Sequence, residues 1–129
     1  MHGLHLTADL WGCRCADAWL LDAERLGPRC VRAVREAGLH AVAQLFHTFS
    51  GTPPLGGGIT ATVLLAESHV CVHTWPEQRA VTLDVYVCNV SADHSAAAQG
   101  LLDALIALFE PSQTQIQRLQ RGQPPTARA

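Results

Sequence analysis

Apolar and polar residues alternate at the start of the chain. Leu4, Leu6, Ala8 and Leu10 occupy every second position, and the residues between them are polar. Alternation with a period of two is typical of a β-strand that buries one face. The pattern therefore predicts a strand over residues 5–11 that opens the domain.

The following stretch has helical spacing instead. After Asp22 the apolar residues recur three or four positions apart, and they are Leu26, Cys30, Val31, Ala33 and Val34. Asp22 is a suitable N-cap and Gly38 a suitable stop, so we expect a helix over residues 22–37. Pro28 lacks an N–H group, and we expect it to delay or kink the start of this helix.

The remainder of the chain predicts five more strands and one more helix. The strand-like runs cover residues 40–49, 59–66, 69–75, 80–88 and 113–119. Ser91 is a suitable cap for a helix that runs to Phe109. Proline and glycine cluster without periodicity in the loop over residues 51–58, which we expect to be mobile. The polar tail over residues 122–129 is expected to be disordered.

The order of these elements limits the fold. Two helices among six strands are too few for the crossover connections that parallel neighbours need. We therefore expect an α+β fold, a two-layer α/β sandwich in which an antiparallel-rich sheet carries both main helices on one face. A length of 129 residues with 48% hydrophobic content fits a single domain over residues 1–129.

Charge and apolar content exclude several classes of protein. The net charge is −2 and the nine basic residues are scattered arginines, so nucleic acid is not an expected partner. The chain does not start like a signal peptide, and no apolar run approaches ~18 residues, so we expect a soluble protein without membrane contact. The five cysteines lie mostly in apolar stretches, which suits reduced thiols in the cytoplasm.

The sequence contains no lysine, and this absence excludes further classes of enzyme. Pyridoxal phosphate enzymes and lysine-dependent aldolases need a lysine amine for their Schiff bases, and a P-loop needs its lysine for phosphate. All three classes are excluded, and with them pyridoxal phosphate as the cofactor.

Reactive side chains are concentrated in residues 66–77. This segment contains one serine, two histidines, two glutamates and a tryptophan. On a strand, His69 and His73 would share one face. A histidine could meet the hydroxyl group of Ser68 only if the chain turns tightly at Glu67, so a strained turn there would be functional.

Several interpretations of these residues remain open. His69, Cys71 and His73 could bind zinc from one strand face, but no fourth ligand is evident. Cys13 and Cys15 could be half of a metal site, but no second pair completes it, and we expect no metal. A serine–histidine hydrolase pair would need a Gly-x-Ser-x-Gly elbow, which is absent. A purely structural role is the remaining interpretation.

A longer pattern carries a resemblance. The runs Glu67-Ser-His69, His73-Thr-Trp-Pro-Glu77 and Asp84-Val-Tyr-Val-Cys88 together resemble the processing and catalytic segment of the prokaryotic S-adenosylmethionine decarboxylases. The similarity begins at residue 4 and ends at residue 122, so it covers nearly the whole chain.

The resemblance implies that the chain is a proenzyme. It implies a cut between Glu67 and Ser68, which gives a beta chain of residues 1–67 and an alpha chain of residues 68–129. Ser68 would become a covalent pyruvoyl group, the cofactor that forms a Schiff base with the substrate in place of pyridoxal phosphate.

The same resemblance assigns three further positions to processing and catalysis. His73 would assist the cleavage, and Thr60 would do so where the family usually has a serine. Cys88 would return a proton to the substrate carbon, a task that suits a thiol because thiols are mostly protonated at neutral pH.

The substrate implied by the resemblance is S-adenosylmethionine, in the synthesis of spermidine and other polyamines. Phe49 and Trp75 match the family's base-stacking aromatic residues, and Glu77 is a candidate polar contact. The resemblance also implies a homodimer of cleaved protomers or a higher homo-oligomer, with the active site near the interface.

Some positions depart from the family pattern. The loop between Phe49 and Thr60 is longer than usual, Gln78 replaces an aromatic residue and Asn89 replaces a glycine. These changes lie on the substrate side, so a pyruvoyl-dependent ornithine or arginine decarboxylase on the same scaffold is the first alternative. A non-catalytic regulatory homologue is the second.

Overall fold

Six strands form one sheet in the computed structural model, which describes residues 2–51 and 56–125. The strands are β1 (Gly3–Trp11), β2 (Ala41–Thr48), β3 (Ile59–Leu65), β4 (Ser68–Trp75), β5 (Ala80–Cys88) and β6 (Gln113–Arg121). The helices are α1 (Ala18–Leu21), α2 (Ala23–Glu36) and α3 (Ser95–Phe109), with a 3-10 turn, η1 (Pro76–Gln78). The strand order is β2-β3-β4-β5-β1-β6, and all neighbours are antiparallel.

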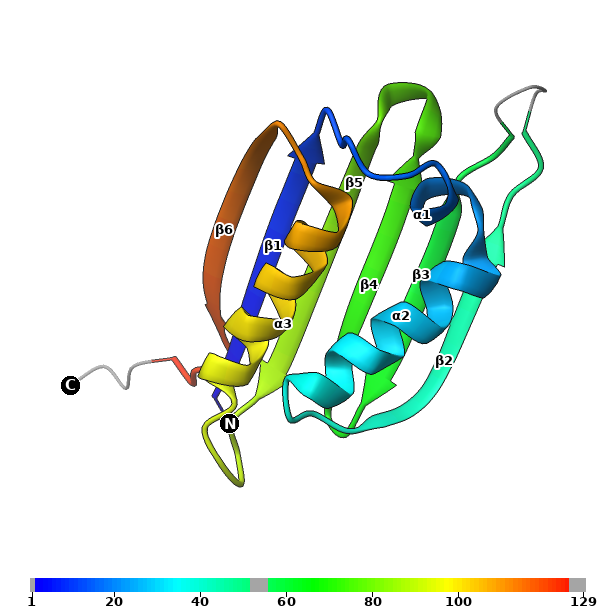
Figure 1. Cartoon of the computed structure of the whole chain (residues 1–129). Helices are drawn as coiled ribbons and strands as arrows, with labels where there is room; N and C mark the ends of the chain where they lie inside the picture. The colour runs from blue at the N-terminus through cyan, green and yellow to red at the C-terminus, as the bar shows by residue number, and fades with distance from the viewer. Residues whose placement is uncertain (1, 52–55, 126–129) are drawn as a thin grey trace.

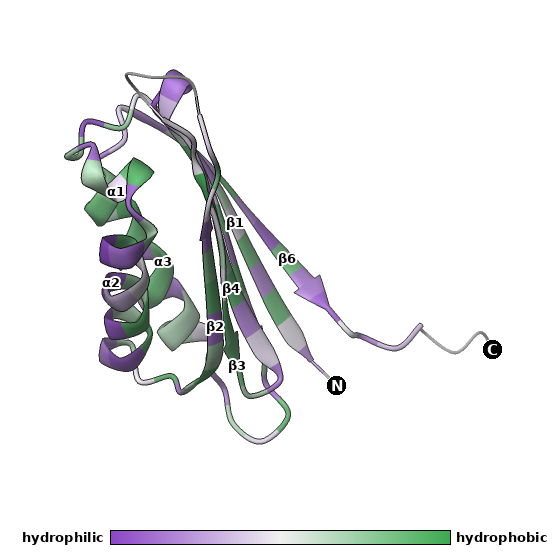
Figure 2. Cartoon of the chain, turned by 90° about the vertical axis from the view of Figure 1, so that its right-hand side faces the viewer, coloured by the Kyte–Doolittle hydropathy of each residue, from purple (hydrophilic) through white to green (hydrophobic). Residues whose placement is uncertain are grey.

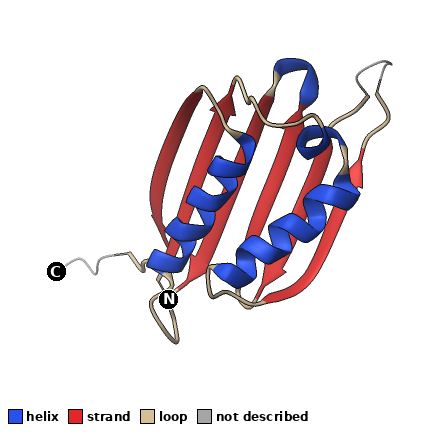
Figure 3. Cartoon of the chain, in the orientation of Figure 1, coloured by secondary structure: helices blue, strands red, loops and turns tan. Residues whose placement is uncertain are grey.

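The two long helices lie on the same face of the sheet. In Figure 1 and Figure 3, α2 runs along the β2 side of the sheet and α3 along the β1 side. The view turned by 90° shows the helices as one layer and the strands as a second (Figure 2). This arrangement confirms the predicted α+β sandwich, with an antiparallel sheet and both main helices on one face.

The core fills the space between these two layers. The helices contribute buried apolar side chains, including Leu26, Val34, Leu101, Leu105 and Phe109. Each central strand contributes every second residue, so its remaining residues point away from the helices. We call this second surface the open face, and its central residues are His5, Thr7 and Asp9 on β1, Thr82, Asp84, Tyr86 and Cys88 on β5, His69, Cys71 and His73 on β4, and Thr60 and Thr62 on β3.

The helix predicted over residues 22–37 is α2, and its cap is confirmed. The Asp22 carboxylate accepts a hydrogen bond from the N–H of Glu24 at 3.0 Å, and Gly38 ends the helix in a left-handed conformation. The expectation that Pro28 delays the start is wrong, because the helix begins at Ala23. Pro28 lies inside the helix, where it lacks the N–H that would bond the carbonyl of Glu24.

The second long helix, α3, starts later than predicted. Ser91 is not its cap, because the helix begins at Ser95. Side chains hold the preceding segment as a turn: the Asn89 amide oxygen accepts from the N–H of His94 at 2.8 Å, and the Asp93 carboxylate accepts from the N–H of Ser95 at 2.9 Å. The short elements α1 and η1 were not predicted, since single turns are too short to show periodicity.

Two predicted flexible segments are only partly described. Residues 122–125 of the tail adopt no regular structure. Residues 126–129 of the tail and 52–55 of the predicted mobile loop lie outside the described residues. Within the described ranges, every helix is too short or too polar to cross a membrane.

Candidate active site

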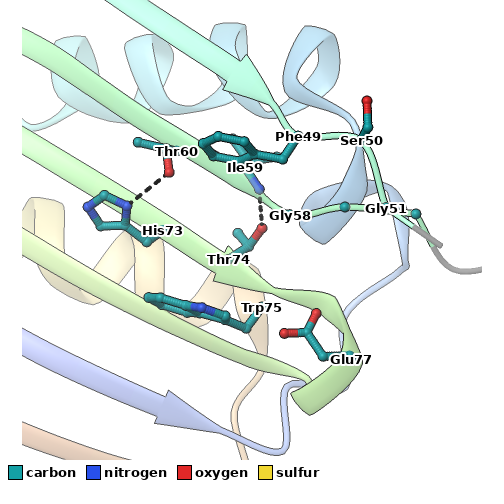
Figure 4. A pocket seen from close by; sticks show the side chains of 12 residues that line it. Phe49, Ser50, Gly51, Gly58, Ile59, Thr60, His73, Thr74, Trp75 and Glu77 are labelled. Carbon is teal, nitrogen blue, oxygen red and sulfur yellow. Dashed lines mark hydrogen bonds between the residues drawn. The ribbon is translucent and has the colours of Figure 1, made fainter.

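A cavity of about 470 Å³ opens at one end of β3 and β4. Its lining includes Phe49, Thr60, His73, Trp75 and Glu77. Phe49 lies beside β3, Trp75 projects from β4, and Glu77 sits on the turn that follows (Figure 4). The structure thus brings together all three predicted substrate contacts and both predicted processing side chains. Phe49, which precedes the long loop, also lines the cavity.

Thr60 and His73 form a pair in this cavity. They occupy opposite positions in the β3–β4 register, and the Thr60 hydroxyl oxygen lies 3.2 Å from Nδ1 of His73. The hydroxyl group of Thr60 thus lies within hydrogen-bonding distance of the histidine that the same resemblance assigns to processing. Each side chain fixes the orientation of the other.

A buried threonine that the sequence analysis did not select forms the floor beside them. Thr74 accepts a hydrogen bond from the N–H of Ile59 at 2.8 Å and donates one to the carbonyl of Leu20 at 2.7 Å. A Cβ added to Gly58 would overlap the Thr74 carbonyl oxygen, so only glycine allows this approach. The sequence did contain one sign of this role: on β4, Thr74 follows Val70 and Val72 at the positions that face the helices.

The other two predicted catalytic residues lie at the opposite end of the sheet. The Ser68 hydroxyl oxygen accepts a hydrogen bond from the N–H of Cys88 at 3.1 Å. Ser68 also lines a small cavity of about 160 Å³ together with His40 and His94, two histidines that the sequence did not single out. Serine and cysteine, 20 residues apart in the chain, are thus neighbours.

The turn before Ser68 is tight, as the sequence required, but it does not bring a histidine to the serine. Leu65 pairs with Ser68 across a two-residue turn, and Glu67 has a left-handed φ of 57°. His73 is five residues further along the extended strand β4, which separates the two Cα atoms by about 16 Å. The tight turn therefore does not bring His73 to the hydroxyl group of Ser68 within one chain.

A polar aromatic cluster on the open face borders Cys88. The rings of His5 and His69 lie against Tyr86 at centroid distances of 5.9 and 5.6 Å. The imidazole of His5 also lies 3.6 Å from the Asp84 carboxylate, and Nδ1 of His5 lies 3.1 Å from the Arg121 guanidinium. Burial first, and then the positive charge on His5, lowers the pKa of His69. Local sequence patterns show no sign of this cluster, because its members come from four strands.

The cysteines near the N-terminus lie in the core as thiols. Cys13 and Cys15 are buried, and burial raises the pKa of Cys13 to about 11 and that of Cys15 above its usual value. A raised pKa disfavours the thiolate, the form that binds metals. Among residues 2–51 and 56–125, no three His, Cys, Asp or Glu side chains are grouped as a metal site.

Comparisons with known proteins agree with this geometry. The S-adenosylmethionine decarboxylase family matches residues 4–122. The S-adenosylmethionine decarboxylase proenzyme of Picrophilus torridus is 35% identical over 121 residues, which are 93% of this chain and 84% of that protein. The proenzyme of Aquifex aeolicus is 36% identical over 121 residues, with 93% and 81% covered. The crystal structure of adenosylmethionine decarboxylase from Aquifex aeolicus matches with a TM-score of 0.79 and 30% identity, over 98% of this chain and 96% of that one.

The fold and these relatives define a carboxy-lyase that derives a covalent pyruvoyl cofactor from a serine of its own chain. The chain belongs to the S-adenosylmethionine decarboxylase family in its prokaryotic form, whose proenzymes serve polyamine biosynthesis.

Proposed function

We propose that the chain cleaves itself between Glu67 and Ser68 and then decarboxylates S-adenosylmethionine. The observation that carries this proposal is the contact between Ser68 and Cys88, directly after a left-handed residue at the predicted cleavage site. The products would be residues 1–67 and 68–129. Residues at the two ends of β4 would then have separate tasks: one end forms the pyruvoyl group and the other binds the substrate.

The cleavage uses atoms of the chain alone, apart from water. The Ser68 Oγ attacks the carbonyl carbon of Glu67, and the peptide bond becomes an ester as its nitrogen is released. Loss of the Ser68 α-proton then expels the Glu67 carboxylate and leaves dehydroalanine. Hydrolysis of dehydroalanine releases ammonia and leaves the pyruvoyl group.

The residues around Ser68 fit this group. The pyruvoyl group, once formed, supplies a carbonyl that accepts the electron pair left when carbon dioxide departs. Cleavage removes the turn that holds Ser68 on the helix side of the sheet, so the new N-terminus of β4 is free to move toward the open face. Cys88 already lies on that face and holds the proton that the substrate carbon needs.

Substrate recognition is assigned to the 470 Å³ cavity. The rings of Phe49 and Trp75 are 51% and 39% exposed, as surfaces that stack on a purine and bind a sulfonium cation should be. Glu77 supplies a polar contact in the same cavity. A cavity for ornithine or arginine would need more carboxylates around a terminal cation, and Glu77 is the one acidic side chain among the described lining residues.

The separation of the two groups favours a homodimer. His73 is too far along β4 to assist Ser68 of its own chain, but it would lie beside the β3–β4 turn of a second chain whose open face packs against its own in the opposite direction. The open face also exposes large apolar side chains at its margins, Leu45, Leu64 and Leu119, which are 69%, 47% and 45% exposed. We therefore propose two composite sites per dimer, each with Ser68 and Cys88 from one chain and the substrate cavity from the other.

We also propose a cytoplasmic location. The cysteines of the described residues form no disulfide bonds with one another, and reduced thiols persist in that compartment.

The intact mass of the denatured protein, after treatment with phenylhydrazine, tests the proposed chemistry. We expect two fragments that meet between Glu67 and Ser68, with the carbonyl reagent bound to the second. Ser68→Ala should give one unmodified chain, while Cys88→Ala should give both fragments but turn over poorly. A single unmodified wild-type chain would refute the proposal and favour a regulatory homologue instead.

A further inference from the structure

The backbone at Arg79 is unusual for an arginine. Arg79 ends η1, the turn between β4 and β5, with φ 49° and ψ 43°. Glycine adopts this left-handed conformation without steric cost, whereas residues with a Cβ do not. The position is held by main-chain bonds on both sides: the N–H of Arg79 donates to Pro76 at 3.1 Å, and its carbonyl accepts from the N–H of Cys13 at 2.9 Å.

The guanidinium group of Arg79 holds a second segment of the chain. Its Nε donates to the Cys13 carbonyl at 2.8 Å, its Nη2 to the Cys15 carbonyl at 2.5 Å and its Nη1 to the Asp17 carboxylate at 2.6 Å. A planar fork with fixed donor directions satisfies three acceptors at once, which the single ammonium group of lysine does not reproduce. Arg79 therefore clamps the β4–β5 turn to residues 13–17.

Both clamped segments lead directly to the substrate cavity. Trp75 and Glu77, which line it, are within four residues of Arg79 on the turn. Residues 13–17 lead into α1, where the carbonyl of Leu20 accepts the hydrogen bond from Thr74 in the cavity floor. The turn and the floor are thus both tied to the segment between β1 and α2, from two directions.

We propose that Arg79 is a positioning residue that holds Trp75 and Glu77 in the conformation that binds the adenosine part of the substrate. Arg79 is not part of the cavity lining, so it acts through these two side chains. This inference rests on the proposed function of the cavity. The Arg79 side chain bonds Cys13, Cys15 and Asp17 and neither Ser68 nor Cys88, so loss of the clamp weakens substrate binding and leaves the chemical step nearly unchanged.

Steady-state kinetics of Arg79→Gly in the processed enzyme test this role. Glycine keeps the left-handed backbone and removes only the clamp. We expect KM to rise about tenfold and kcat to change less than about twofold. Free guanidinium ion at low millimolar concentration should lower KM again in Arg79→Gly and leave the wild type unaffected. Arg79→Lys should show the same raised KM, but guanidinium ion should not lower it. If Arg79→Gly does not fold, the KM of Arg79→Lys tests the inference in its place.

Arg32→Ala is the matched control, because Arg32 pairs with Glu36 on the outer surface of α2 at 2.8 Å, and KM should stay at the wild-type value. The inference is overturned if KM in Arg79→Gly is unchanged, or if the variant lowers kcat about tenfold and leaves KM at the wild-type value. A wild-type protein that neither cleaves itself nor decarboxylates the substrate refutes the proposed function, and that result is distinguishable because it is seen before any variant is made.

Discussion

Single residues at the two ends of β4 have contacts that suit different steps of the reaction. At the first end, Glu67 holds a strained backbone and Ser68 bonds the main chain at Cys88. At the other end, His73 is oriented by Thr60. The left-handed residue Glu67 supplies the carbonyl of the peptide bond that is proposed to break, and its backbone is free to relax once Glu67 becomes a chain terminus.

Replacing Glu67 should separate backbone strain from side-chain chemistry. In a Ser68→Ala background, which stays uncleaved, Glu67→Gly should stabilise the precursor by about 1 kcal/mol over Glu67→Ala, because glycine adopts the left-handed conformation freely. Thermal unfolding of the two double variants measures this difference. With Ser68 present, Glu67→Gly should also cleave up to about fivefold more slowly than Glu67→Ala, since less strain is released. Equal midpoints and equal cleavage rates would show that the turn stores no strain.

The lowered pKa of His69 makes stability depend on pH. Burial and His5 disfavour the protonated form in the folded protein, while Asp84 opposes this effect and Arg121 supports it. The unfolded chain therefore binds the proton more readily, and stability falls as the pH drops below the ordinary value of 6.5. Thermal midpoints at about pH 7.5 and about pH 5.5 should differ less in His69→Gln than in the wild type. His40→Gln, outside this cluster, is the control; the idea fails if both variants behave alike.

Among the elements, the β3–β4 hairpin carries most of the site. Its turn contains the proposed cleavage point, and its open end contains Thr60, His73 and the cavity floor. Thr74 ties this open end to α1 through the carbonyl of Leu20 and to the start of β3 through the N–H of Ile59. The position of the cavity thus depends on one buried hydroxyl group.

Thr74→Val should reveal that dependence. Valine has nearly the same shape but leaves the N–H of Ile59 and the carbonyl of Leu20 without partners, at a cost of about 1 to 3 kcal/mol. Urea unfolding measures the loss. Thr62→Val makes the same chemical change on the half-buried open face of β3, where Thr62 donates to the Val70 carbonyl at 3.3 Å, and it should cost less than half as much. Equal losses would contradict a special role for Thr74.

At the scale of the whole molecule, one face of the sheet is covered by helices and the other is not (Figure 2). The open face is mostly polar, with histidines, threonines and cysteines where a solvated sheet usually has charged residues. Stacked sheets lie about 10 Å apart, so side chains on two facing sheets meet. A second copy of the chain, packed on the open face as proposed, would therefore complete both halves of the site.

Mixing two inactive variants tests this composite site. Cys88→Ala removes the proton donor and Glu77→Gln changes the substrate cavity, and each homodimer should be nearly inactive. In a mixed dimer, one of the two sites combines Cys88 and Glu77 from different chains and is intact. Random mixing of twofold dimers should then restore about a quarter of the wild-type activity, because half the dimers are mixed and half their sites are intact. No recovery beyond the separate variants would refute a site shared between chains.

Sequence reasoning succeeded where the signal is local. The alternation in β1, the cap at Asp22 and the motif from Glu67 to Cys88 each depend on residues close in the chain, and the fold class follows from the order of such elements. It failed for Thr74, whose partner Leu20 is 54 residues away, and for Arg79, whose acceptors are more than 60 residues away. It also left open whether a histidine meets Ser68, because spacing alone does not show whether a tight turn redirects the strand that follows it.

The order of apolar and polar residues was therefore enough to define a two-faced sheet, and the reactive motif was enough to indicate the enzyme family. Neither determined which reactive groups meet. That depends on strand register, which pairs Thr60 with His73 and places Ser68 beside Cys88, and on the extended length of β4, which keeps the two pairs apart. Register and distance are set by packing between segments remote in the chain, so they became known only with the folded molecule.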